Sequence, residues 1–244
     1  MLWVVFLLPF VFSFHPPPSF FSSPLTAFAL GSCNDQYVNQ SYWHVISQAL
    51  HSVPFSKKRS VLEFDNVTDK IRNLFVWMGD AVYSDKQYLP LLYRPNEPKA
   101  VKNAFDLQYE NVYYKRFRES TMVLGTWDDH DSCTNNGGGK MEKCRMVPLH
   151  KSMFLDFLDE PIPSRRRNEA SGIFTSYTFG KGDQLVKMIV LDARSSREHK
   201  PGDLLGEEQW KFLEKELKGS EAKLHFIVSG IQVLSKDKLV HGVT

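Results

Sequence analysis

The sequence predicts an α/β fold, and three observations lead to that prediction. Short apolar runs alternate with stretches whose apolar residues have helical spacing, as expected when strands and helices succeed one another. Several of the apolar runs end directly at polar clusters, as strands do when a site lies at their carboxyl ends. A chain of 244 residues, 42% hydrophobic and 24% charged, is also long and apolar enough for one domain with a substantial core.

Three strands in the first half of the chain each lead into a polar cluster. The strands are predicted at residues 25–30, at 73–78 and within 120–127. The clusters that follow them are Gly31-Ser32-Cys33-Asn34, Gly79-Asp80 and Asp128-Asp129-His130-Asp131. Because ligands bind outside the carboxyl ends of strands in open α/β sheets, we expect the three clusters to converge on one site.

The remaining elements follow the same reasoning. A helix is predicted at residues 42–51, a buried strand at 188–191, a helix at 206–217 and a last strand at 225–233. Glycine and charge enrichment predicts a surface loop at residues 135–143.

The first residues resemble a secretory signal. Residues 1–14 form an apolar run that is too short to span a bilayer, so no transmembrane anchor is expected. We therefore expect a signal peptide and linker at residues 1–23, a single domain at 24–244, and a secreted protein. A hydrophobic terminal strand or a misassigned start is the alternative.

Charge does not indicate a macromolecular partner. The net charge of +2 comes from 30 basic and 28 acidic residues spread along the chain, so nucleic acid recognition is not expected. The local run Arg165-Arg166-Arg167 is a candidate phosphate binder, but a solvated loop is the preferred interpretation.

The three cysteines cannot all pair with one another. Cys133 and Cys144 flank a polar, glycine-rich stretch that a disulfide could close, which leaves Cys33 free. A thiolate is a suitable ligand for iron or zinc, whereas a free cysteine is more often a small core residue. The position of Cys33 at a strand end favours the ligand.

Carboxylates at two strand ends indicate a metal site. Asp80 follows a glycine on a tight turn, where a carboxylate can bridge two ions, and Tyr83 could reach the same ion through its phenolate. The acidic cluster around Asp129 and His130 is unlikely at a buried strand end unless a cation or substrate compensates its charge. Asn135 or Asn136 could add a neutral oxygen ligand or hold the substrate.

Five short motifs occur in the order seen in one enzyme family. They are Gly31-Ser32-Cys33-Asn34, Gly79-Asp80-Ala81-Val82-Tyr83-Ser84-Asp85, Trp127-Asp128-Asp129-His130-Asp131, Leu191-Asp192-Ala193-Arg194 and Leu205-Gly206-Glu207-Glu208-Gln209-Trp210. Through them the sequence resembles the PhoD-like phosphatases, the alkaline phosphatase D family of calcineurin-like metallophosphoesterases. The resemblance implies a two-sheet sandwich flanked by helices and the hydrolysis of small phosphate esters at a site for Fe³⁺ and Ca²⁺.

The resemblance also implies a role for individual residues. Cys33, Asp80 and Tyr83 resemble the iron ligands, with Asp80 bridging to the calcium-type ion, and Asp129 resembles a further ligand. His130 takes the place of the catalytic histidine.

The implied mechanism is in-line attack by a metal-bound hydroxide, while His130 stabilises or protonates the leaving group. Arg194 contacts the phosphate or, in an equally good interpretation, forms a salt bridge with Asp192.

The sequence departs from the family near its end. Members continue past the strand that corresponds to residues 226–233 to a Gly-Asp-Val-His type motif, which is absent here, so we expect a domain that is incomplete at its C-terminus. An exposed sheet edge, through which copies could associate, is expected as a result.

Two function hypotheses follow: a phosphatase, or a catalytically silent truncated isoform or paralogue that binds metal or phosphate without turnover. A secreted calcium-binding domain ranks last, because it leaves Cys33 and Tyr83 unexplained.

Overall fold

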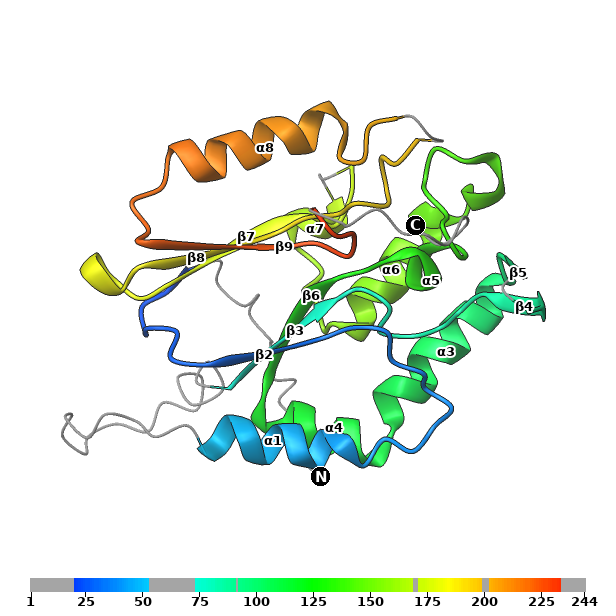
Figure 1. The fold of residues 1–244 in the computed structure, drawn as a ribbon, viewed down its shortest axis with the longest axis horizontal. Coiled ribbons are helices and arrows are strands. Elements are labelled where there is room, and N and C mark those ends of the chain that lie inside the picture. The colour runs from blue at the N-terminus through cyan, green and yellow to red at the C-terminus, as the bar shows by residue number, and fades with distance from the viewer. Residues whose placement is uncertain (1–19, 53–72, 91, 169–170, 199–201, 234–244) are drawn as a thin grey trace, which may run out of the picture.

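The computed structural model describes residues 20–52, 73–90, 92–168, 171–198 and 202–233 (Figure 1). Of the predicted signal segment and linker, residues 1–19 lie outside the described residues. The chain beyond Val233 also lies outside them, so the expectation of an incomplete C-terminal end concerns a part that is not described here.

Two sheets form the centre of the molecule. One contains three parallel strands in the order β2 (Phe28–Gly31), β3 (Leu74–Met78) and β6 (Met122–Thr126). The other has the order β1 (Phe20–Phe21), β7 (Thr175–Phe179), β8 (Val186–Val190) and β9 (Leu224–Val228). In this second sheet β7 runs antiparallel to β8, whereas β8 and β9 are parallel.

The sheets pack face to face because alternate residues of β3 point to opposite sides. Leu74 and Val76 face the second sheet and share a buried cluster with Met188 and Val190 of β8. The next residues along β3 face the other way. Burial on both faces explains why β3 is a continuous apolar run rather than an alternating one.

Helices cover the outer faces of both sheets (Figure 1). A single aromatic-rich cluster joins one face of β3, through Phe75 and Trp77, to helices on that side. These helices are α1 (Tyr42–Ser52), α3 (Pro98–Glu110), α4 (Val112–Ser120) and α6 (Val147–Phe157). On the other side Phe212 and Leu213 of α8 (Gly206–Lys218) pack against β8. The fold is therefore an α/β two-sheet sandwich flanked by helices, as expected.

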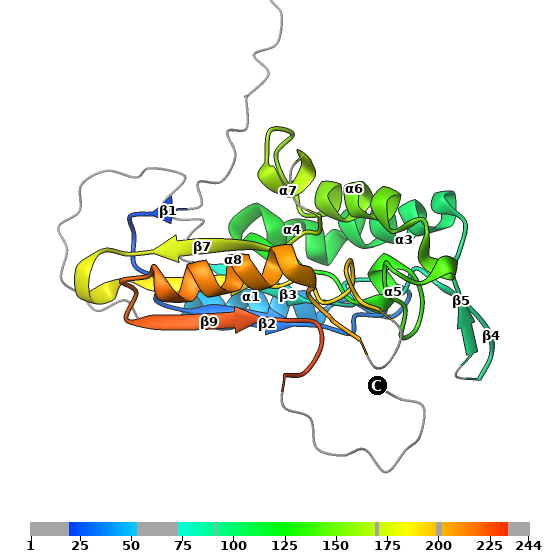
Figure 2. The same cartoon turned by 90° about the horizontal axis from the view of Figure 1, so that it is seen from above.

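Shorter elements complete the described chain. They are the hairpin β4 (Lys86–Leu89) and β5 (Leu92–Arg94), the helices α5 (Asp129–Ser132) and α7 (Arg165–Asn168), and two 3₁₀ turns at Glu142–Cys144 and Gly182–Gln184. Figure 2 shows the β4–β5 hairpin projecting from the same end of the molecule as α5.

The seven predicted strands and helices are all present, with ends shifted by up to five residues. The hairpin, β7 and helices α3, α4 and α6 were not predicted, because they belong to a segment in which aromatic and charged residues alternate without a clean period.

The interpretation of residues 165–167 as a solvated loop was wrong for the central arginine. Arg166 is buried and donates from Nε to the carbonyl of Ile173 (2.8 Å) and from Nη2 to that of Gly125 (2.8 Å). Its Nη1 also pairs with Glu160 at 3.0 Å. Arg166 is thus a structural cation that ties α7 to the end of β6.

Strands β2 and β9 are the outer strands on one side of the two sheets, and in the described residues neither has a partner on its outer edge. The rings of Phe28 and Phe226 meet edge to face with centroids 4.9 Å apart, so the two edges lie side by side. Within the described ranges, both edges lack a neighbouring strand, as expected. No helix in the described ranges combines the length and the apolar character that crossing a membrane requires.

Candidate metal centre at the strand ends

The carboxyl ends of β3 and β6 in one sheet and of β8 and β9 in the other meet at one place. A Cβ added to Gly79, after β3, would lie 2.4 Å from Cβ of Asp128, and one added to Gly230, after β9, would lie 2.8 Å from its Oδ1. Thr126 at the end of β6 donates to the carbonyl of Leu191 after β8 at 2.6 Å. These contacts confirm that the strand-end clusters converge.

Asp80 occupies the tight turn that the sequence predicts. Gly79 and Asp80 have φ of 98° and 49°, a left-handed conformation that turns the chain sharply after β3. The Asp80 carbonyl accepts the amide of Asn34 at 2.8 Å, which holds the loop after β2 against this turn. The carboxylate is buried, and its Oδ1 accepts the amide of His130 at 3.3 Å.

Asp80, Asp129 and His130 form a buried group that could hold a metal ion. Each offers one ligand atom, and these atoms all lie within 4.8 Å of one another. Burial, together with the charges of Asp129 and Asp128, raises the pKa of Asp80 to about 7. Two buried carboxylates at this separation repel each other unless a cation lies between them, so the residues present fit a metal ion.

Cys33 and Tyr83 lie beside this group, as predicted. Cys33 has a φ of 55°, is exposed and unpaired, and its Sγ is 3.8 Å from Oδ2 of Asp80. Burial, the charges of Asp80 and Cys33 and a hydrogen bond with Cys33 raise the pKa of Tyr83 above its ordinary value. A cysteine at the surface of the site is not the small core residue of the alternative interpretation.

His130 is held by an aspartate that the sequence did not single out. Its Nδ1 lies 2.8 Å from Oδ1 of Asp85, whose side chain is completely buried. The other oxygen of Asp85 accepts from Thr134 Oγ1 (3.0 Å) and from the amide of Asn135 (2.9 Å). These bonds fix the direction of the Asp85 carboxylate and, through it, the plane of the imidazole.

Two aromatic rings enclose the imidazole of His130. The ring of Tyr83 lies 4.4 Å away, and Tyr93 of the β4–β5 hairpin meets it edge-on at 5.1 Å. The hairpin therefore forms one wall of the site.

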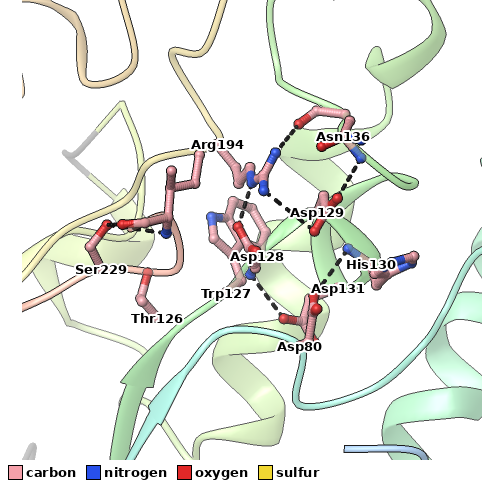
Figure 3. A network of polar contacts seen from close by, with 12 residues as sticks. Asp80, Thr126, Trp127, Asp128, Asp129, His130, Asp131, Asn136, Arg194 and Ser229 are labelled. Atoms are coloured by element: carbon pink, nitrogen blue, oxygen red, sulfur yellow. Dashed lines mark hydrogen bonds and ion pairs between the residues drawn. The ribbon is translucent and has the colours of Figure 1, made fainter. Parts of the chain in front are cut away.

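Arg194 is engaged by carboxylates rather than free to bind a ligand (Figure 3). Its Nε pairs with Asp128, its Nη2 lies 3.4 Å from Oδ1 of Asp129, and its Nη1 donates to the carbonyl of Gly137 at 3.1 Å. The predicted salt bridge between Arg194 and Asp192 is absent, because only the main-chain amide of Arg194 donates to that carboxylate, at 2.9 Å.

The acidic cluster after β6 divides into residues with different tasks. Asp131 is fully buried and accepts the amides of Val82 (3.0 Å) and Asp128 (2.9 Å), so it is a structural cap between two strand ends. Asp128 neutralises Arg194. Of this cluster, only Asp129 and His130 belong to the group that could hold a metal ion. Asp128 and Asp131 have structural roles instead.

The glycine-rich stretch is a loop, as predicted, and Lys140, Glu142 and Lys143 are exposed. The expected surface position is wrong for Gly137 and Gly138, which are buried against the site. The predicted disulfide between Cys133 and Cys144 closes the loop. Within it the amide of Asn136 donates to Asp129, and a Cβ added to Gly139 would lie 2.2 Å from the carbonyl oxygen of Ser195. Asn135 contributes its main chain to Asp85, and its side-chain role as a ligand stays a prediction.

Sequence reasoning missed Asp85 and Tyr93. Asp85 lies 45 residues from its partner His130, and nothing local distinguishes it from a solvated acidic turn. Its one signal is its place five residues after Asp80 within the quoted motif. Tyr93 gives no signal, because its role depends on how the hairpin folds back.

A comparison with protein-family models finds one match, described as PhoD-like phosphatase, over residues 61–240. No curated protein and no solved structure gives a significant match. The matched segment covers most of the chain and includes Asp80, Asp129 and His130. The family implies phosphoesterase activity, in accord with the buried metal-binding group. This chain belongs to the PhoD-like phosphatase family.

Proposed function

We propose that this protein hydrolyses small phosphate esters at the centre formed by Asp80, Asp129 and His130. The observation that carries the proposal is the pairing of two buried carboxylates with a histidine that is fixed by a buried aspartate, at the strand ends of a chain of this family. Such a group can hold metal ions and also supply a proton to a leaving oxygen.

Fe³⁺ and Ca²⁺ are the proposed ions. Cys33, Asp80 and Tyr83 would hold the iron, because a thiolate and a phenolate suit a strongly Lewis-acidic ion. Asp129 and Asn135, with Asp80 between the two positions, would hold the calcium, which prefers oxygen ligands. When bound, the ions supply Lewis acidity toward the phosphate oxygens and the attacking water.

His130 is the proposed general acid. Its Nδ1 faces Asp85, so the hydrogen bond there stabilises the doubly protonated ring and leaves the second nitrogen to donate. The enclosing Tyr83 and Tyr93 limit the motion of the ring. Asp85 is thus a positioning residue that acts through His130.

Hydrolysis of 4-nitrophenyl phosphate by the purified, metal-loaded chain tests the proposal. We expect turnover that Asp80→Asn abolishes and that Asp106→Asn, which alters an exposed carboxylate on α3, leaves unchanged. A chain that binds metal but gives no turnover would be the silent isoform or paralogue instead.

The identity of the iron-type site has a separate test. A phenolate bound to ferric iron gives a visible charge-transfer band, so Tyr83→Phe should bleach or shift the colour of the loaded protein, and Cys33→Ser should weaken iron retention. A colourless, active enzyme that holds only calcium or zinc would remove the assignment of Tyr83 and Cys33.

Export is also proposed. The Cys133–Cys144 disulfide supports it, because structural disulfides persist mainly in oxidising compartments. N-terminal sequencing of the mature protein should show that residues near the start have been removed. An intact start in a protein retained in the cytosol would contradict the proposal.

A further inference from the structure

Arg197 is a buried cation without a complete set of partners. Arg197 is only 6% exposed. Within the described part of the chain, nothing accepts a hydrogen bond from its buried Nη1. Arg194, three residues earlier, presents the opposite case, because two carboxylates and a carbonyl already engage its guanidinium.

The main chain fixes Arg197 against Arg194 and the glycine-rich stretch that supports the metal centre. Its amide donates to the Arg194 carbonyl at 3.2 Å, and its own carbonyl accepts the amide of Lys140 at 3.3 Å. Its side-chain stem lies against Gly138, where an added Cβ would come within 2.7 Å of the Arg197 Cβ. The same glycine-rich stretch donates to Asp129, so the arginine and the metal group share one supporting loop.

The charges around Arg197 leave it uncompensated. Burial and the neighbouring Arg194 lower its pKa, and this outweighs the attraction of Asp129 and Asp128. Those two carboxylates are already shared by Arg194, and a guanidinium cannot lose its proton to relieve the cost. An anionic oxygen next to Nη1 would satisfy both the unpaired donor and the charge of this guanidinium.

We propose that Arg197 binds a non-bridging oxygen of the phosphate group that occupies the metal centre, whereas Arg194 serves to hold Asp128 and Asp129 in place. The proposal rests on the proposed function, since it concerns the same site. Guanidinium donors match phosphate oxygens in geometry and charge, and they replace the hydration that burial removes.

A binding role and a structural role of Arg197 predict different melting temperatures for a variant that lacks the guanidinium. If Arg197 stabilised the fold, its replacement by a methionine of similar length would lower the melting temperature. If it is held unpaired for a ligand, Arg197→Met should leave the melting temperature of the phosphate-free protein unchanged or raise it, and should remove most of the stabilisation that phosphate gives.

The test is thermal unfolding of the metal-loaded 244-residue chain over a series of inorganic phosphate concentrations. We expect Arg197→Met to weaken the phosphate Kd about 10- to 100-fold, the range for a hydrogen bond to a charged group. Arg197→Lys, which keeps the charge, should fall between. Arg116→Met, an exposed arginine on α4, is the matched control and should match the wild type.

Three outcomes overturn the proposal: an unchanged phosphate Kd in Arg197→Met, a lower melting temperature of that variant without phosphate, or a variant that fails to fold. The result is separable from the proposed function. A chain that binds phosphate through Arg197 yet hydrolyses no ester removes the function and keeps this inference. If the chain hydrolyses esters while Arg197→Met keeps the wild-type phosphate Kd, the proposed function stands and the role of Arg197 is removed.

Discussion

In the metal-free protein the surroundings of His130 favour its protonated form, although the residue is largely buried. Burial alone lowers its pKa, but the hydrogen bond to Asp85 and the charges of Asp85, Asp129 and Asp80 outweigh burial and raise the pKa to about 9. A general acid must be protonated at the start of the reaction, and in the metal-free protein the Asp85 hydrogen bond favours that state of the imidazole.

Replacing Asp85 should therefore disable the acid without removing it. We expect Asp85→Asn to lower the His130 pKa toward its ordinary value, move the alkaline limb of the rate profile to lower pH, and reduce kcat about 10- to 100-fold. NMR titration of the imidazole and a pH–rate profile measure the two effects. Asp106→Asn is the control, and an unshifted His130 pKa in Asp85→Asn would refute the positioning role.

Metal binding should be linked to a proton on Asp80. In the metal-free protein its pKa is raised to about 7, so the carboxylate binds a proton as the pH falls below 7, and an incoming cation must displace that proton. Affinity should therefore fall as the pH drops from 8 to 6, with proton release on binding. Calorimetry in two buffers of different ionisation enthalpy measures the release, and a pH-independent affinity would contradict the prediction.

At the scale of elements, the loop between Cys133 and Cys144 supports two carboxylates of the site. Its amides donate to Asp85 and Asp129, and its glycines allow the chain after β8 to approach closely. The loop has no helix or strand of its own beyond a short 3₁₀ turn, so its shape depends on the disulfide and on these contacts.

Loss of the disulfide should therefore affect stability and site together. With a sequence separation of 11 between the cysteines, the unfolded-state entropy removed corresponds to about 3 kcal/mol. We expect the Cys133→Ser, Cys144→Ser double variant to lose about that much unfolding free energy and to bind metal more weakly. Denaturant titration and metal competition provide the measurements. A stable double variant with unchanged metal affinity would show that the loop is held by its other contacts.

The sequence predicts best those elements whose pattern of buried faces gives a regular apolar pattern along the chain. Strand β3 is apolar throughout because both faces are covered, and α8 is amphipathic because only one face is. The site residues at strand ends follow from topology. Asp85, Arg166 and Arg197 could not be assigned, because a lone charged residue has the same sequence signal whether it is solvated or buried, and only tertiary contacts decide.

At the scale of the molecule, the two outer strands carry exposed apolar side chains. Leu224 and Ile227 of β9 are 49% and 47% exposed, and Leu30 of β2 is 48% exposed. Unpaired strand edges that carry apolar side chains favour pairing with another chain.

We therefore expect the chain to self-associate through β9. Ile227→Lys should reduce the association, because a lysine on an edge strand opposes strand addition. Val45→Lys is the control, because Val45 is an exposed residue of α1, and it should have no effect on the association. Sedimentation velocity over a concentration series measures this, and a monomeric wild type, or equal association of both variants, would contradict it.

The central claim is that Asp80 and Asp129 hold metal beside His130, and the metal content of the purified protein tests it most directly. The chain is loaded with iron and calcium, separated from free ions and analysed by elemental mass spectrometry, alongside Asp80→Asn and Asp106→Asn. The account predicts bound metal in the wild type and Asp106→Asn, and its loss in Asp80→Asn. Equal metal content in the wild type and Asp80→Asn, or no metal in either, would contradict it.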